Sequence, residues 1–246
     1  MNDRLIVALD MNDLKKIQTI VDGLGDRVNW YKIGAVPFTY FGPEIVKFIK
    51  SKGRKVMLDL KYHDIPNTVA RSCEGAMAMG VDMLTLHIQG GFQMLEAVVQ
   101  AALLTVDVKK VERPKLLGIT VLTSFDEALF KDMFGDISRT LDEHVLFLAQ
   151  LAQSAGLDGV VASPQETAKI RRTCGKDFLI VTPGIRAPGQ SEDQGDDQAR
   201  TMTAAEAIKA GADYIVVGRP IVKAKDPLAA AKKILEEIEH GFGKTA

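Results

Sequence analysis

Residues 57–68, MLDLKYHDIPNT, place acidic and basic side chains directly after an apolar run. In an extended strand, Asp59 and Lys61 are two positions apart and point to the same face. A carboxylate beside an ammonium keeps both groups charged, and fixed charges of this kind can stabilise charge that develops during a reaction. The spacing therefore predicts an electrostatic catalytic site at the end of this strand.

Ionisable residues also accompany other apolar runs. Asp10 follows the first run, Lys32 lies in the second, and Asp64 comes shortly after Lys61. Any one of them alone would more often be a solvated loop charge or half of a surface ion pair. Their repeated placement favours a shared site, in which Lys32, Asp59, Lys61 and Asp64 are the charged members.

Eight short apolar runs rich in β-branched residues must position these side chains. Their near-continuous apolar character is typical of parallel strands buried on both faces, and segments of helical period separate them. The starts of successive runs are about 30 residues apart, one βα unit each, which favours an α/β fold of the (β/α)8 TIM-barrel type over an open sheet. The runs span residues 5–9, 29–33, 55–60, 83–87, 116–122, 159–162, 178–182 and 214–218.

Glycine and proline mark the ends of the expected helices. Gly53, Gly80, Gly156 and Gly211 stand just before strands, where a residue that adopts positive φ closes a helix. Pro66 is expected to open the helix that follows the charged segment, because the first turn of a helix does not need its amide proton.

The chain is expected to form one catalytic domain over residues 1–246, because no Pro/Ser-rich linker divides it. The polar stretch 187–200 is too long for a tight connector, so we expect it to form a lid. In a barrel of this kind, reactive residues lie at the carboxyl ends of the strands.

Composition excludes several classes of function. Lys and Arg number 31 against 32 Asp and Glu, and this balance provides no general attraction for nucleic acid or anionic lipid. Cys73 and Cys174 cannot form a disulfide framework and lack metal-site spacing, so two reduced, buried thiols are expected. We find neither a signal peptide nor an 18-residue apolar stretch, and we therefore expect a cytoplasmic protein without a membrane span.

The motifs together resemble the orotidine 5′-phosphate decarboxylase family, in its bacterial form. DLKYHDIPNT is similar to the family signature D-x-K-x-x-D-I-x-x-T. Dinucleotide-binding, Walker, zinc-protease and serine-hydrolase motifs are absent, which favours a site without cofactor. Further similar segments follow in order: ALD (8–10), YKIG (31–34), LHIQGG (86–91), TVLTS (120–124), TPGIR (182–186), GDDQAR (195–200) and IVVGRPI (215–221).

The resemblance implies decarboxylation of orotidine 5′-monophosphate to uridine 5′-monophosphate and CO2, the last step of de novo pyrimidine synthesis. Lys61 would protonate the carbanion left at C6, and Asp59 would face the departing carboxylate. Lys32 and Asp64 would complete an alternating array, with no metal and no cofactor.

The resemblance also assigns substrate contacts and a homodimer. The pyrimidine and the phosphate would be held by loops after the later strands, in keeping with the phosphate sites of other barrels. Asp64 and Thr68 would complete the site of the partner chain. The implied contacts are Asp10, Lys32 and Thr68 for the ribose, Asp59 for the carboxylate, Thr123 and Ser124 for the pyrimidine, and Gly218, Arg219, Arg186 and Gln198, or Gln194 in its place, for the phosphate.

Two other functions are known for barrels with similar motifs or folds, and both are disfavoured here. Magnesium-dependent sugar-phosphate decarboxylases and synthases are similar around D-x-K-x-x-D but carry an acid where this chain has Lys32, and an ammonium there would repel Mg2+. A barrel that only binds nucleotide is disfavoured because the charged set is intact. His63 and His87 lie near the expected mouth without metal-ligand spacing, so we expect them to be hydrogen-bonded scaffolding.

Overall fold

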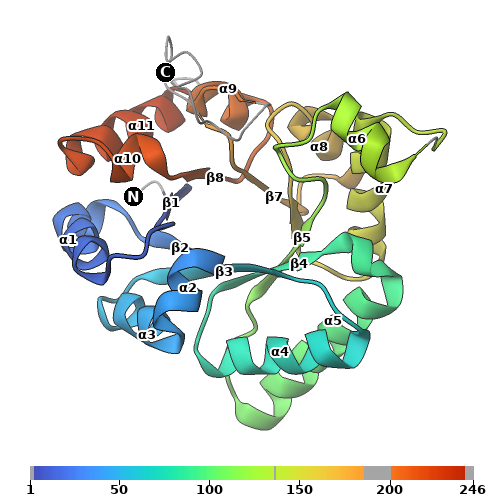
Figure 1. The fold of residues 1–246 in the computed structure, drawn as a ribbon, viewed down its shortest axis with the longest axis horizontal. Coiled ribbons are helices and arrows are strands. Elements are labelled where there is room, and N and C mark those ends of the chain that lie inside the picture. Colours follow the sequence, from blue (N-terminus) through green and yellow to red (C-terminus); the bar gives the residue numbers. More distant parts are fainter. Residues whose placement is uncertain (1–2, 136, 186–200, 242–246) are drawn as a thin grey trace.

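The computed structural model describes residues 3–135, 137–185 and 201–241. Within them, eight parallel strands close into a barrel in the order of the chain, with helices around it (Figure 1). Each apolar run identified in the sequence overlaps one strand, so the predicted (β/α)8 fold is confirmed. The strands are β1 (Leu5–Ala8), β2 (Trp30–Gly34), β3 (Lys55–Tyr62), β4 (Met83–His87), β5 (Lys115–Ile119), β6 (Gly159–Val161), β7 (Leu179–Thr182) and β8 (Tyr214–Val217).

Helices form the outer ring. The glycines expected to close helices, Gly53, Gly80, Gly156 and Gly211, all have positive φ, and Pro66 is the first residue of its helix. The helices are α1 (Leu14–Leu24), α2 (Ala35–Phe41), α3 (Pro43–Ser51), α4 (Pro66–Ala78), α5 (Gly91–Lys109), α6 (Glu127–Phe134), α7 (Leu141–Ser154), α8 (Thr167–Cys174), α9 (Ala204–Lys209), α10 (Arg219–Val222) and α11 (Pro227–Gly241), with 3-10 turns η1 (Gly25–Arg27) and η2 (Ile88–Gly90).

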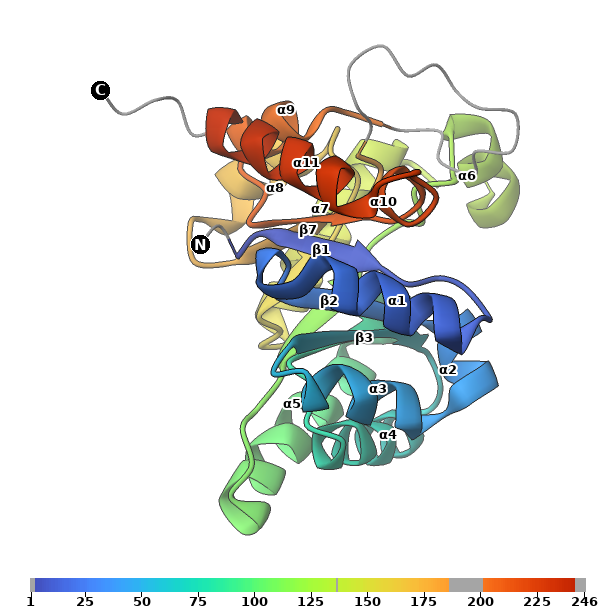
Figure 2. The ribbon, with the colours of Figure 1, turned by 90° about the vertical axis from the view of Figure 1, so that its left-hand side faces the viewer.

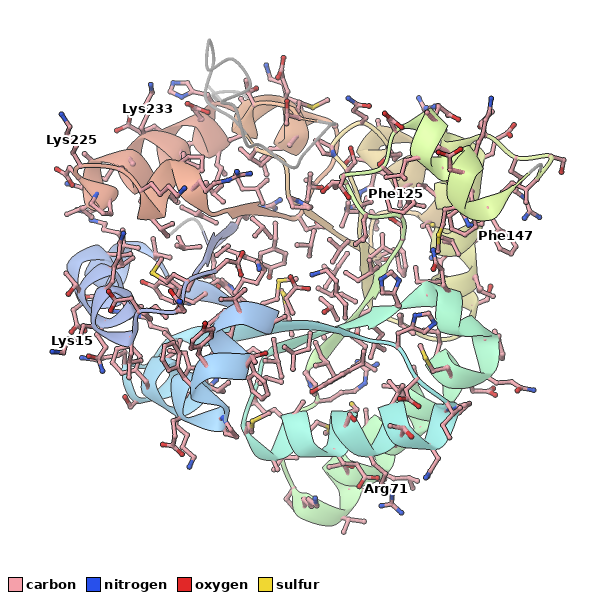
Figure 3. All side chains as sticks on the ribbon, viewed as in Figure 1. Lys15, Arg71, Phe125, Phe147, Lys225 and Lys233 are labelled. Carbon is pink, nitrogen blue, oxygen red and sulfur yellow. The ribbon has the colours of Figure 1, made fainter. Side chains whose placement is uncertain are left out.

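The first and last strands of the chain lie side by side and close the barrel. β8 pairs with β1 in parallel, and α11 packs beside α1 (Figure 2). Strand residues point alternately inward and outward, so one apolar cluster fills the barrel and a larger one lies between the strands and the helices (Figure 3). The inner cluster consists of Ile6, Ala8, Trp30, Met57, Met83, Leu117, Val181 and Val216.

Aspartates immediately before three of the strands tie the amino-terminal end of the barrel together. Asp82, Asp158 and Asp213 precede β4, β6 and β8, and each carboxylate accepts a hydrogen bond from a backbone amide of the preceding strand. Each also forms an ion pair with a basic side chain. At this end of a barrel, such interactions serve stability rather than chemistry. The amides belong to Val56, Leu116 and Ile180, and the basic partners are Lys50, Arg113 and Arg171.

The segment Ile88–Lys109, which contains α5, is long and apolar enough to cross a membrane by length and composition. The expectation that no such stretch exists is therefore wrong. One such helix is weak evidence for a membrane span, because core helices pass the same test. α5 packs against α4 in the outer ring, and Met94, Leu95 and Val98 on it are fully buried.

Four aromatic rings pack where α6 meets α7. The ring centroid of His144 lies 5.3 Å from that of Phe130, 5.0 Å from that of Phe134 and 6.0 Å from that of Phe147. Burial lowers the pKa of His144, and the positive charge of Arg139 lowers it further. His144 is therefore held neutral inside an apolar cluster.

The stability of the protein is expected to fall as pH drops from 7.5 to 5.5, in part because of His144. Its pKa is lower in the folded chain than in the unfolded chain, so the unfolded chain binds more protons once the pH falls below about 6.5. His144→Phe should reduce this loss of unfolding free energy, measured by urea denaturation at both pH values. His240→Phe, at an exposed position on α11, is the matched control. An unchanged pH dependence in His144→Phe would contradict the assignment.

Candidate active site

A cavity of about 610 Å3 opens at the carboxyl ends of the strands. Its floor is apolar and includes Met57, Val161 and Val216 from the barrel interior. Eight of the residues assigned to the site from the sequence line it: Asp10, Lys32, Asp59, Lys61, Thr123, Ser124, Gly218 and Arg219.

Two carboxylates and two ammoniums alternate along one side of this cavity. Lys61 Nζ lies 2.9 Å from Asp59 Oδ2, and Lys32 Nζ lies 3.3 Å from the same oxygen. Lys32 Nζ also donates to both carboxylate oxygens of Asp10, at 2.9 and 3.0 Å. The array within one chain thus runs Asp10, Lys32, Asp59, Lys61, with Asp10 at the Lys32 end.

Burial and pairing oppose each other in this array, and pairing prevails. Burial disfavours the charged form of Lys32, but Asp59 and Asp10 outweigh it and raise the pKa of the ammonium. Burial likewise disfavours ionised Asp59, but Lys32 and Lys61 outweigh it and lower the pKa of the carboxyl group. Both groups are therefore charged near neutral pH, in a site where only 9% of Lys32 and 7% of Asp59 is exposed.

The strand that carries Asp59 and Lys61 is irregular where it reaches the cavity. Both residues lie within β3 rather than after it, and the pairing of β3 with β4 shifts register between Leu58 and Tyr62. Lys61 has a φ of +50°, a left-handed conformation that is costly for a residue with a Cβ atom. The predicted meeting of the two side chains is observed, but through a bulge and not through simple strand alternation.

Gly34, at the end of β2, was not assigned to the site from the sequence. A Cβ atom at this position would lie 2.5 Å from Asp10 Oδ1 and 3.1 Å from Lys32 Nζ. The Asp10–Lys32 pair therefore packs directly against the glycine backbone. The signal in the sequence was the glycine that ends YKIG, directly after the strand that carries Lys32.

The basic end of the cavity lies where β8 passes into α10. Gly218 and Arg219 line it as expected, and Lys16 and Lys223 line it as well. Lys223 could have been found, because it follows Arg219 by four residues and so lies on the same side of a helical turn. Other residues assigned to the phosphate lie outside the described residues: Arg186, Gln198, its alternative Gln194, and the stretch 187–200.

Asp64 and Thr68 are not among the residues that line the cavity of this chain. The carboxylate of Asp64 accepts a hydrogen bond from the amide of Ile65 at 2.7 Å and is exposed. Thr68 is exposed in the first turn of α4. Neither residue thus joins the array of its own chain.

His63 and His87 stack near the array, with ring centroids 5.3 Å apart. Burial lowers the pKa of His87, and His63 and Lys61 lower it further. Cys73 and Cys174 are buried and free. Across residues 3–135, 137–185 and 201–241, no group of three His, Cys, Asp or Glu side chains is arranged to hold a metal ion.

Comparisons with known proteins agree with this geometry. Residues 3–234 match the model of the "Orotidine 5'-phosphate decarboxylase / HUMPS family". The chain is 48% identical over 242 residues to the orotidine 5'-phosphate decarboxylase of Syntrophus aciditrophicus, covering 98% of this chain and 94% of the relative. It is also 48% identical to that of Geobacter metallireducens, covering 97% of each.

Solved structures give the same result. The crystal structure of orotidine 5'-phosphate decarboxylase from Lactobacillus acidophilus superposes with a TM-score of 0.82 at 36% identity, covering 96% of this chain and 99% of the other. The enzyme from Pyrococcus horikoshii superposes with a TM-score of 0.75 at 26% identity, over 96% and 99% of the two chains. The chain therefore belongs to the orotidine 5'-phosphate decarboxylase / HUMPS family.

Proposed function

We propose that this protein decarboxylates orotidine 5′-monophosphate to uridine 5′-monophosphate and CO2, the last step of de novo pyrimidine synthesis, without metal or cofactor. The observation that carries the proposal is Asp59, a buried carboxylate shared by the ammoniums of Lys32 and Lys61. The relatives that match the chain over nearly its whole length carry the name of this activity.

The chemistry needs a place for the electron pair that CO2 leaves behind. When the bond between C6 and the carboxylate breaks, the pair remains on C6, and the Lys61 ammonium provides both the countercharge and the proton. Proton transfer from Nζ to C6 yields the product, and the lysine then regains a proton from solvent. Asp59 faces the departing carboxylate and holds the Lys61 ammonium in place through the ion pair at 2.9 Å.

The remaining cavity residues hold the substrate. Asp10 and Lys32 bind the ribose, Thr123 and Ser124 bind the pyrimidine, and the phosphate lies at Gly218 and Arg219, where a guanidinium can bind two oxygens. Arg186 and Gln198 complete the phosphate site in this proposal.

The magnesium-dependent sugar-phosphate enzymes of the same superfamily are disfavoured by Lys32. Its ammonium lies within 3.3 Å of the carboxylates of both Asp10 and Asp59, so it occupies the position between the oxygens that a cation would need. Mg2+ is held by oxygen ligands, and a fixed positive charge among them opposes its binding.

The activity is tested by loss of the orotate-type ultraviolet absorbance when purified protein meets orotidine 5′-monophosphate with a chelator present. Conversion under these conditions is expected. Conversion that requires added Mg2+ would favour the sugar-phosphate class, and no conversion under either condition would overturn the proposed function.

We further propose that the protein is an isologous homodimer, in which Asp64 and Thr68 complete the site of the partner chain. Two observations support this arrangement. Both residues are exposed and do not line the cavity of their own chain. Ile65, between them, is an apolar side chain that is 67% exposed, and a partner chain would cover it. We also propose that the enzyme acts in the cytoplasm, in line with its two free, buried cysteines, and that it binds neither nucleic acid nor membrane, in line with its balanced charge.

Mixing inactive Lys61→Ala and Asp64→Asn subunits is expected to restore activity. A mixed dimer holds one doubly damaged site and one intact site, so free exchange recovers at most about a quarter of wild-type activity. Mass spectrometry of the mixture confirms that subunits have exchanged. No recovery after confirmed exchange would mean that each site is built within one chain.

A further inference from the structure

One residue of β4 stands opposite the bulge that carries Asp59 and Lys61. Leu58 pairs with Leu84, and Tyr62 pairs with Leu86. Three residues of β3, Asp59 to Lys61, therefore face the single residue Thr85. Its side chain is fully buried.

The hydroxyl group of Thr85 joins the two ends of this bulge. It accepts a hydrogen bond from the backbone amide of Lys61 at 3.0 Å and donates one to Asp59 Oδ1 at 3.0 Å. A hydroxyl can do both at once, because it has one donor and two acceptor positions. A valine would have the same shape and could do neither.

The two oxygens of Asp59 have different partners as a result. Oδ1 receives the Thr85 hydroxyl, and Oδ2 receives the ammoniums of Lys61 and Lys32. The hydrogen bond from Thr85 thereby turns Oδ2 toward the cavity. At the same time, the Thr85 hydroxyl oxygen accepts the hydrogen bond from the Lys61 amide. This bond holds Lys61 in a backbone conformation that the residue would otherwise avoid.

We propose that Thr85 is a positioning residue for decarboxylation, and this inference rests on the proposed function. It acts through Asp59 and Lys61, and it does not line the cavity itself. Fixing charges before the reaction is what makes electrostatic stabilisation effective, so a loss of this hydroxyl should affect turnover more than substrate affinity.

The test compares Thr85→Val, which keeps the shape and removes the hydroxyl, with Thr85→Ser, which keeps the hydroxyl. The loss of a hydrogen bond to a charged group corresponds to a decrease of about 10- to 100-fold in a rate constant that depends on it. We expect Thr85→Val to lower kcat by that factor with KM changed less than about threefold, and Thr85→Ser to remain within about fivefold of wild type. The matched control is Thr167→Val on α8, which removes an equally buried threonine hydroxyl that donates to the carbonyl of Ser163.

Two further measurements separate positioning from simple loss of structure. The affinity for uridine 5′-monophosphate, which has no carboxylate, should be unchanged in Thr85→Val if the cavity is intact. Hydrogen exchange of the Lys61 amide, followed by NMR, should accelerate at least about tenfold in Thr85→Val and not in Thr85→Ser. Should the valine variant fail to fold, Thr85→Ala removes the hydroxyl without added bulk.

The outcomes distinguish this inference from the proposed function. Wild-type protein that does not decarboxylate the nucleotide would overturn the function, while Lys61 amide exchange would still decide the role of Thr85. Active wild type together with a Thr85→Val variant that keeps more than half of kcat, or equal losses in the valine and serine variants, would overturn the inference alone.

Discussion

Lys61→Ala is expected to lower kcat by at least about 1,000-fold and to leave the barrel folded. The substitution removes the proton donor for C6 and the main countercharge to the carbanion. Asp59 keeps Lys32 as a partner at 3.3 Å, so the buried carboxylate is not left without a cation. The measurements are turnover of the nucleotide and thermal unfolding by circular dichroism.

A second variant, Lys61→Gly, controls for the backbone. With φ at +50°, alanine retains the strain of the native residue, whereas glycine adopts this conformation freely. The glycine variant should thus be more stable than the alanine variant by about 1 kcal/mol and equally inactive. If either variant kept more than a tenth of wild-type kcat, a loss below about 1.4 kcal/mol of transition-state stabilisation, Lys61 would have no central role.

Much of the fold could be predicted because the strands of a parallel barrel are buried on both faces. Each strand is therefore a nearly continuous apolar run in the sequence. β4 was predicted to the residue, and the other strands to within a few residues. Short helices such as α2 and α10 have too few turns to show a helical period, and they were missed. The aspartates that tie β4, β6 and β8 to their neighbours were also missed, because a lone Asp before a strand has the appearance of an ordinary turn residue.

The charged centre of the site could be predicted because its members are close in sequence or follow strands directly. Side-chain alternation predicts that Asp59 and Lys61 meet, but it does not show the bulge through which they do so. Thr85 was beyond reach for the same reason, because its role depends on which residue of β4 stands across from that bulge. Gly34 meets Asp10 because β2 pairs with β1, and Lys16 lines the cavity from α1.

The second large effect on activity is expected at the end of the cavity that is proposed to bind the phosphate. Arg219→Ala is expected to lower kcat/KM for orotidine 5′-monophosphate by at least about 100-fold, a loss of about 2.7 kcal/mol. The corresponding nucleoside has no phosphate for Arg219 to hold, so its slow reaction should change less than about threefold. Both substrates must be measured on both proteins, and Lys225→Ala, an exposed position near Arg219 that does not line the cavity, controls for the general positive field.

Comparing nucleotide with nucleoside also tests whether the binding energy of the phosphate contributes to kcat as well as to affinity. Interactions with a remote group raise kcat when they help to assemble the reacting site, so a substrate without phosphate should lose kcat as well as affinity on the wild-type enzyme. In the Arg219→Ala variant, kcat and KM for the nucleotide should both shift toward the values for the nucleoside. Equal proportional losses for nucleotide and nucleoside would instead mean that Arg219 supports the fold or the pyrimidine site, and the phosphate assignment would have to be abandoned.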